Sequence, residues 1–238
     1  MTSMALSLPL ASTPFPGGAD TACAGQASPL PSAGAIYRRL IGCAPAHALV
    51  GNTAAFDRHV LAAILAVSAS EGGPVASRCG LAAHEISDLL HRFFPAVGDL
   101  GARWQAHAAP LDEESAMVRD LLLAQRSADP QVGGWLAAML ARRAMEPNHL
   151  WEDLGLRARD ELTRLMNRHF APLAGRNTRN MRWKRFFYRS LCEDDGFVMC
   201  ATPVCTECGD FALCFGDESG ESRMAERRRN IALAAPAS

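Results

Sequence analysis

The sequence carries no excess of charge of either sign. Its 238 residues include 24 Lys and Arg against 25 Asp and Glu, which gives a formal net charge of -1. Non-specific binding to nucleic acid depends on positive charge that neutralises phosphates. We therefore expect no nucleic-acid partner. Lysine itself is almost absent, because Lys184 is the only lysine among these cations.

Long hydrophobic runs are also missing. A membrane-spanning helix needs roughly 18 or more apolar residues, and the longest apolar run here, residues 60–67, is typical of a core helix. The N-terminus has no basic region, and Pro9 interrupts its short apolar run, which argues against a secretory signal. We therefore expect a cytoplasmic protein with no membrane partner.

Alternating runs of β-branched residues, which are typical of half-buried strands, are almost absent, and apolar residues recur instead at helical spacing. These positions, which include one histidine, are Phe56, Val60, Ile64 and Val67; Ile86, Leu89, Leu90 and Phe93; Met117, Leu121 and Leu122; Trp135, Met139 and Leu140; Leu162, Leu165, Met166 and His169; and Trp183, Phe186, Phe187 and Leu191. The carboxylates at residues 112–114 and the pair Asp129-Pro130 favour helix starts, and Pro95 favours a helix end.

These patterns predict an all-α protein with a single helical domain over residues 36–192. Residues 1–35 are mostly Ala, Ser, Pro, Gly and Thr, so we expect them to be disordered. Residues 193–230 are expected to form a C-terminal non-helical four-cysteine metal-binding loop and a short terminal helix. Residues 231–238 are expected to be a frayed tail.

Four of the eight cysteines lie close together in this loop: Cys200, Cys205, Cys208 and Cys214, with the spacing C-x4-C-x2-C-x5-C. In a chain without an export signal, such density indicates metal or redox chemistry rather than a disulfide framework. Thiolates are soft ligands that suit zinc and iron–sulfur clusters. We therefore predict that these four side chains hold a metal centre.

Two kinds of metal centre, a zinc ion and an iron–sulfur cluster, are possible in this loop. Structural zinc sites usually present two C-x2-C pairs separated by about a dozen residues or more, whereas this loop contains a single C-x2-C. The first three cysteines match the C-x4-C-x2-C opening of plant-type ferredoxins, which favours a cluster. The sequence contains no GxGxxG, P-loop, GxSxG or HExxH motif, so we expect a binding protein rather than an enzyme.

Candidate ligands also lie outside the loop. His149 precedes a helix start and offers an imidazole that can ligate a metal, and Cys192 is a candidate fifth thiol. The alternative for His149 is a hydrogen-bonded structural residue. For Cys192, as for Cys43 and Cys79, the alternative is a small buried hydrophobe. His169 lies on an apolar stripe, so we interpret it as a core histidine.

A basic segment precedes the cysteines. Its cations are Arg176, Arg179, Arg182, Lys184, Arg185 and Arg189, and no carboxylate occurs among them until Glu193. If the segment is a helix, a buried aromatic stripe leaves the cations on its other faces. They form either a site for an anion or an acidic partner surface, or an ordinary solvated face. The candidate anion and docking residues are Arg179, Arg182, Lys184, Arg185 and Arg189.

These motifs resemble the NifQ family of nitrogen-fixation proteins. The similar segments are residues 142–156, residues 165–170, and residues 177–192 followed by the four cysteines and Phe215-Gly216. The resemblance covers roughly residues 36–216. Its most specific part is the cysteine spacing with the aromatic and basic residues before it, and none of the motif cysteines is missing.

The resemblance implies a carrier of molybdenum for the assembly of the iron–molybdenum cofactor of nitrogenase. It implies that the four motif cysteines hold an iron–sulfur cluster able to incorporate molybdenum. The implied partners are the nitrogenase cofactor-assembly scaffold and the nitrogenase iron protein. The resemblance further implies that molybdate is the anion attracted by the basic segment, and that molybdenum or iron is the metal that His149 would ligate. From the residues alone, two other interpretations stay open: a zinc-stabilised interaction module, and an iron–sulfur electron-transfer protein without molybdenum.

Overall fold

The chain is described by a computed structural model over residues 30–98, 100–107 and 110–194. Within these ranges every regular element is a helix and none is a strand, so the predicted all-α class is confirmed there. The predicted four-cysteine loop, the short terminal helix and the frayed tail lie outside the described residues. So do residues 1–29 of the segment predicted to be disordered.

The described elements are one 3-10 helix and a series of α-helices of unequal length. They are α1 (Ala33–Ile41), η1 (Pro45–His47), α2 (Thr53–Ser70), α3 (Val75–Cys79), α4 (Ala83–Phe93), α5 (Ala102–Gln105), α6 (Glu113–Ala124), α7 (Pro130–Ala144), α8 (Leu150–Asp153), α9 (Arg159–His169), α10 (Ala171–Arg176) and α11 (Trp183–Asp194). Among these helices, none combines the length and the apolar character that crossing a bilayer requires.

Local side-chain signals define several helix ends where the sequence predicts them. The Oδ1 atom of Asp112 accepts a hydrogen bond from the backbone N–H of Ser115 at 2.8 Å, which caps α6. At the start of α7, Oδ1 of Asp129 accepts from two backbone N–H groups of the first turn, both at 3.0 Å, and Pro130 is the first helical residue. Helix α4 ends two residues before Pro95.

The helical region begins earlier than the boundary predicted at residue 36. Helix α1 starts at Ala33, because the Oγ atom of Ser32 accepts a hydrogen bond from the third backbone N–H group after it. Ile36, Tyr37 and Leu40 on this helix are buried. Their burial offsets the ordering entropy that the composition of residues 30–35 cannot offset by itself.

The apolar stripe predicted for α6 is partly wrong. Leu121 and Leu122 are buried as predicted, but the Met117 side chain is 45% exposed and Val118 lies in the core instead. Val118, Leu121 and Leu122 follow the i, i+3, i+4 spacing of one helix face, and Met117 lies outside that face.

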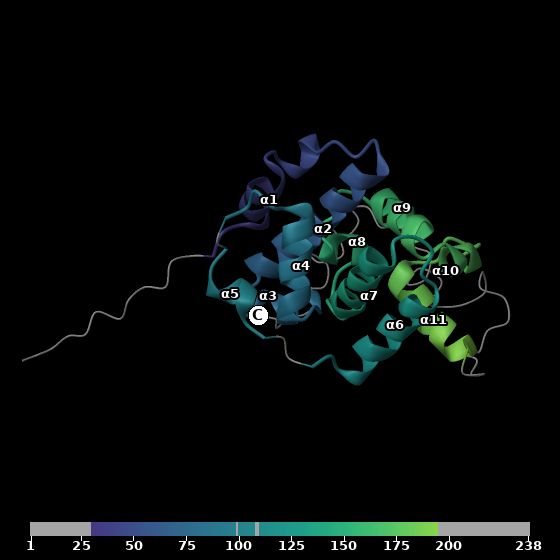
Figure 1. The fold of residues 1–238 in the computed structure, drawn as a ribbon. Coiled ribbons are helices and arrows are strands. Elements are labelled where there is room, and N and C mark those ends of the chain that lie inside the picture. Colours follow the sequence, from purple (N-terminus) through teal and green to yellow (C-terminus); the bar gives the residue numbers. More distant parts are fainter. Residues whose placement is uncertain (1–29, 99, 108–109, 195–238) are drawn as a thin grey trace, which may run out of the picture.

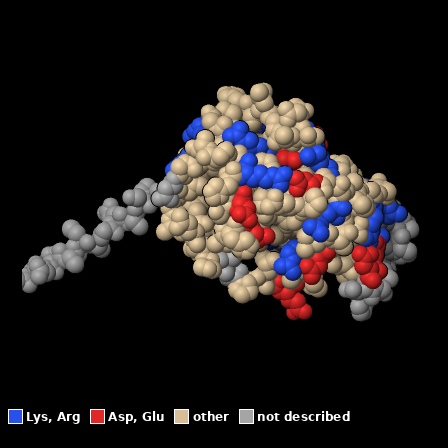
Figure 2. Space-filling view, in the orientation of Figure 1, with Lys and Arg blue, Asp and Glu red and all other residues tan. Residues whose placement is uncertain are grey.

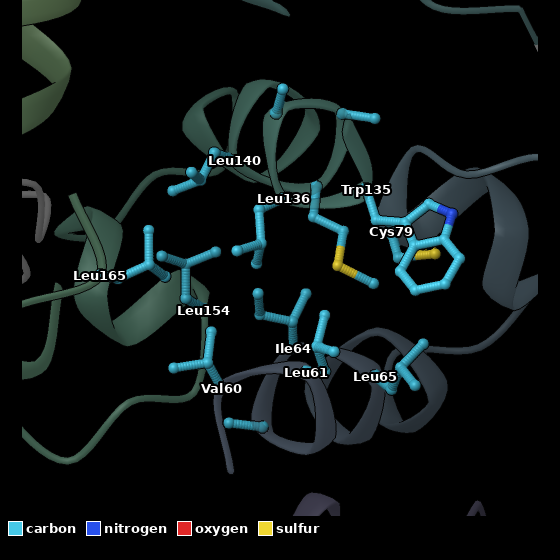
Figure 3. Packing of buried hydrophobic residues seen from close by; sticks show 14 of the residues in the cluster. Val60, Leu61, Ile64, Leu65, Cys79, Trp135, Leu136, Leu140, Leu154 and Leu165 are labelled. Carbon is cyan, nitrogen blue, oxygen red and sulfur yellow. The ribbon is translucent and has the colours of Figure 1, made fainter. Parts of the chain in front are cut away.

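Helices α2 and α7 lie near the middle of the molecule, and the other helices surround them (Figure 1). Figure 3 shows Leu61 and Ile64 of α2 pointing toward Leu136 of α7, with Leu154 beside them. Both helices are buried on most of their faces, as expected of helices enclosed by others. Around them, α1 packs along α2, α6 along α7, and α11 against α6, while α3 contacts both α2 and α7.

Two glycines end helices in the left-handed backbone region, but their surroundings differ. Gly80 follows α3 with φ 76°, and a Cβ atom there would lie 2.7 Å from the carbonyl oxygen of Ala138 on α7. Gly42 follows α1 with φ 94°, and a Cβ atom there would meet nothing within 4 Å. Gly80 therefore combines a backbone requirement with close packing of α3 on α7, whereas Gly42 has the backbone requirement alone.

We expect Gly80→Ala to destabilise the protein more than Gly42→Ala does. Left-handed backbone strain should lower the free energy of unfolding by about 1–2 kcal/mol in both variants. Steric overlap with α7 should add about 1–3 kcal/mol in Gly80→Ala only. Urea unfolding of the two variants and the parent protein measures the difference. Equal losses would show that the α3–α7 contact tolerates the extra methyl group.

Candidate functional site

Helix α11 is the element that leads toward the four cysteines. Its aromatic residues Trp183, Phe186 and Phe187 are buried, and Trp183 and Phe186 pack edge to face with ring centroids 5.8 Å apart. The aromatic stripe predicted for this segment is therefore confirmed. The helix packs against α6 and ends at Asp194. The predicted metal ligands Cys200, Cys205, Cys208 and Cys214 follow it, outside the described residues.

Lys184 differs from the other cations of the basic segment, because its charge is paired inside the fold. Its Nζ atom lies 2.7 Å from Oδ2 of Asp153 on α8 and also donates to the carbonyl oxygen of Glu146. Burial lowers the pKa of Lys184 below its ordinary value, against the opposing effect of Asp153. Asp153 is itself buried. Because the ammonium group of Lys184 already donates hydrogen bonds to Asp153 and Glu146, we remove Lys184 from the candidate anion and docking residues.

The pair formed by Lys184 and Asp153 belongs to a larger buried network. The Arg143 side chain on α7 is almost completely buried. Its two terminal nitrogen atoms each lie 2.7 Å from a carboxylate oxygen of Glu71, and its Nε atom donates to the carbonyl oxygen of Asp153 at 2.7 Å. Glu71 caps the end of α2. The network therefore joins α2, α7, α8 and α11 through charged hydrogen bonds.

Two carboxylates that follow the basic segment in the sequence pair with two of its arginines. Arg176 binds Asp194 with nitrogen–oxygen distances of 2.8 and 3.2 Å, and Arg189 binds Glu193 at 2.6 Å. The first pair joins the end of α10 to the end of α11, whereas the second lies within α11. A cavity of about 210 Å³ lies here, lined partly by Arg176, Arg179 and Arg189. The charge of the segment is thus partly compensated in space, although no carboxylate lies within it in the sequence.

The other candidate ligands, His149 and Cys192, belong to no metal site formed by the described residues. In the described part of the chain, no three His, Cys, Asp or Glu side chains approach closely enough to hold a metal ion together. His149 is the N-cap residue of α8, and Cys192 is half-buried on α11 as a free thiol. Cys43 is half-buried too, whereas Cys79 is fully buried, and burial raises its pKa to about 12. The interpretation of Cys79 as a small core hydrophobe is confirmed.

His169 is a core histidine, as predicted, and it belongs to a buried charged cluster. Its Nε2 atom lies 2.9 Å from Oδ1 of Asp57 on α2, and Arg168 binds both oxygens of the same carboxylate at 2.8 Å. Burial by itself would raise the pKa of Asp57, but the hydrogen bonds from His169 and Arg168 outweigh burial and lower it. Sequence analysis missed Asp57 because its partners lie more than a hundred residues away.

A second buried cluster joins α1, α2 and α9. The hydroxyl of Tyr37 lies 2.5 Å from Nδ1 of His59, and Nε2 of His59 lies 3.2 Å from Oε2 of Glu161. Arg157 donates to Oε1 of Glu161 at 2.6 Å. Burial alone would raise the pKa of Glu161, but the hydrogen bonds from His59 and Arg157 outweigh it and lower the pKa to about 2. Because Tyr37 and His59 are fully buried, this cluster holds helices together rather than facing a substrate.

The fold and the sequence define a class of protein: a chain whose described residues form helices and no strands, and whose last described helix is followed in the sequence by four closely spaced cysteines. The model of the protein family NifQ matches residues 60–216, a span that runs from α2 through the fourth cysteine. The chain belongs to the NifQ family. It is therefore one of the proteins of nitrogen fixation and iron–molybdenum cofactor biosynthesis.

Relatives of known name are similar over most of their length. The chain is 40% identical over 179 residues to the NifQ homolog of Sinorhizobium fredii, covering 70% of this chain and 75% of the relative. It is 39% identical over 160 residues to the NifQ protein of Rhodobacter capsulatus, covering 67% and 87%. It is 37% identical over 146 residues to the NifQ protein of Azotobacter vinelandii, covering 61% and 68%. No solved structure matches the chain.

We expect Lys184→Ala and Arg185→Ala, two neighbouring changes on α11, to have different effects on stability. Removing Lys184 leaves the buried carboxylate of Asp153 without its cation, so the free energy of unfolding should fall by about 3 kcal/mol. Arg185 makes no ion pair among the described residues, so its removal should change this value by no more than about 0.5 kcal/mol. Urea unfolding measures both. Similar losses would contradict the distinction between structural and surface cations.

The cluster around Glu161 predicts a pH dependence of stability. Because the pKa of Glu161 in the folded state lies below its ordinary value of 4.5, its contribution is present above that value and is lost as the pH falls toward 2. The full contribution is roughly 3 kcal/mol. We expect Glu161→Gln to lose most of this stability at pH 7 and to show a shallower decline from pH 5 to pH 3. Glu113→Gln, a change at an exposed carboxylate, should leave the parent pH profile unchanged, and equal profiles for all three proteins would refute the assignment.

Proposed function

We propose that this chain is a cytoplasmic carrier of molybdenum and not an enzyme. In this proposal Cys200, Cys205, Cys208 and Cys214 hold an iron–sulfur cluster that incorporates molybdenum as cargo. The chain then donates the metal for iron–molybdenum cofactor assembly. The observation that carries the proposal is the family match, which continues beyond α11 through all four cysteines. The partners we propose are the nitrogenase cofactor-assembly scaffold and the nitrogenase iron protein.

The donor chemistry of the chain supports this choice of ligands. No group of three ligating side chains forms within the described ranges, whereas the sequence places four thiols in one short segment. Four thiolates complete the ligand set of a cluster or of a tetrahedral metal. Because metal centres can order the segments that bind them, this segment can gain its structure from the cargo itself.

The end of α11 supports the handling of an anionic metal precursor. Molybdate is a dianion, and Arg179 and Arg189 line the small cavity between the ends of α10 and α11. Arg182 and Arg185 belong to the same basic segment. We propose these four arginines as the surface that attracts molybdate or an acidic partner, with Lys184 holding the helix in place.

Elemental analysis of anaerobically purified full-length protein from molybdate-supplied cells tests this proposal. We expect iron together with molybdenum in the parent protein. Both should be lost in a Cys205→Ala, Cys208→Ala variant, because it lacks two of the four thiolates. Cys43→Ala is the matched control, since Cys43 lies near the end of α1 and should retain both metals. Loss of iron or molybdenum in a Cys192→Ala variant would show that a fifth thiol contributes to the metal centre.

Two other results would each overturn the carrier proposal. Zinc alone, from cells supplied with iron, would favour a zinc-stabilised interaction module in which the cysteines only fold the segment. Iron without molybdenum, in a protein that is reversibly reduced, would favour an electron-transfer role. Retention of iron and molybdenum in the double cysteine variant would place the centre elsewhere in the chain.

A further inference from the structure

A second cavity lies where the ends of several helices meet, away from α10 and α11. Its volume is about 950 Å³, at the upper end of the range of about 300–1,000 Å³ that is usual for small-molecule sites. The end of α1, the first turns of α2, the end of α4, the start of α7 and the end of α9 form its walls. In the view of Figure 1, α1, α2 and α9 lie in the upper half of the molecule, and α4 and α7 lie nearer its middle.

The lining of this cavity carries more positive than negative charge. Arg39, Arg58, Arg92 and Arg168 contribute four guanidinium groups, whereas the only carboxylates in the lining are those of Asp57 and Asp129. Each carboxylate already has a cation within the fold, because Arg168 binds Asp57 and Arg92 binds Asp129. Figure 2 shows such neighbouring cations and carboxylates on one face of the molecule. Of the cations in the lining, Arg58 is the one whose contacts leave its charge available to a ligand.

Arg58 has most of its hydrogen-bonding capacity left for a ligand. A guanidinium group carries five N–H donors. One nitrogen of Arg58 donates to the carbonyl oxygen of Leu40 at 3.3 Å, and the group lies over the ring of Phe94, 5.7 Å from its centroid. No carboxylate among the described residues pairs with Arg58. The side chain is exposed but oriented by these two contacts, so its remaining donors are held at the cavity.

Apolar side chains form another part of the lining. Ile41, Phe93 and Val97 pack against the core with one side and remain partly exposed at the cavity. The guanidinium of Arg92 lies over the Phe93 ring, 5.2 Å from its centroid, which fixes the ring at the wall. A small inorganic anion would leave these apolar surfaces in contact with water. A ligand with an apolar body would cover them.

We propose that this cavity binds an organic anion. Its carboxylate or phosphate group would accept hydrogen bonds from Arg58, and its apolar body would lie against Ile41, Phe93 and Val97. Carboxylates and phosphates share the geometry that the planar guanidinium fork recognises. Among the described residues, the lining of this cavity includes none from α10 or α11.

Isothermal titration of the full-length protein with small probes tests this proposal. The anionic probes with an apolar body are phenyl phosphate and benzoate; inorganic phosphate lacks the body, and benzyl alcohol lacks the charge. We expect at least one of the two aromatic anions to bind about tenfold or more tightly than inorganic phosphate, because only they cover the apolar wall. Benzyl alcohol should show no measurable binding. Aromatic anions that bind no more tightly than inorganic phosphate would overturn the proposal.

Variants then locate the binding. Arg58→Gln should weaken the binding of the aromatic anion about tenfold to a hundredfold, because it removes a charged hydrogen-bond donor. Arg38→Gln is the matched control, since Arg38 is an exposed cation near the end of α1 that does not line the cavity, and it should leave the affinity unchanged. Val97→Ser should weaken the aromatic anion without weakening inorganic phosphate. Far-ultraviolet circular dichroism confirms that each variant is folded, and unchanged affinity in folded Arg58→Gln would refute the site.

Discussion

The buried guanidinium of Arg143 imposes a constraint that organises much of the fold. A charge removed from water is tolerated only where oxygen atoms surround it at hydrogen-bonding distance. Here the oxygens come from Glu71 at the end of α2 and from the backbone of Asp153 in α8, while Arg143 belongs to α7. Three helices must therefore meet at one point. The Asp153 carboxylate in turn binds Lys184, which brings α11 to the same place.

This network separates two roles within a segment that looks uniform in the sequence. Lys184 serves the core, and Arg176 and Arg189 pair with the carboxylates at the end of α11. The start of α11 is thus fixed by the ion pair and by buried aromatic rings, while its end carries exposed charges. In the function we propose, the cysteines that follow α11 in the sequence hold the metal, and the exposed cations of the basic segment attract its anionic precursor.

Sequence patterns predicted the long helices because the signals that start and stop a helix act within a few residues. The caps at Asp112 and Asp129 act within three residues, and Pro95 stops a helix by its own geometry. Long-range contacts had no such signal. Asp57 meets His169, and Lys184 meets Asp153, only after the chain has folded back on itself. The wrong prediction for Met117 has the same origin, because the face of α6 that is buried depends on α7.

The sequence by itself determined the helical class of the described residues, through helical spacing of apolar residues, and the family, through the cysteine spacing and the residues before it. It determined neither which cations are structural nor where cavities form. Those features depend on side chains from distant parts of the chain, such as Arg58 of α2 and Val97 after α4, which meet only through packing. Tertiary structure decided them, because burial and charge pairing depend on proximity in space rather than on spacing along the chain.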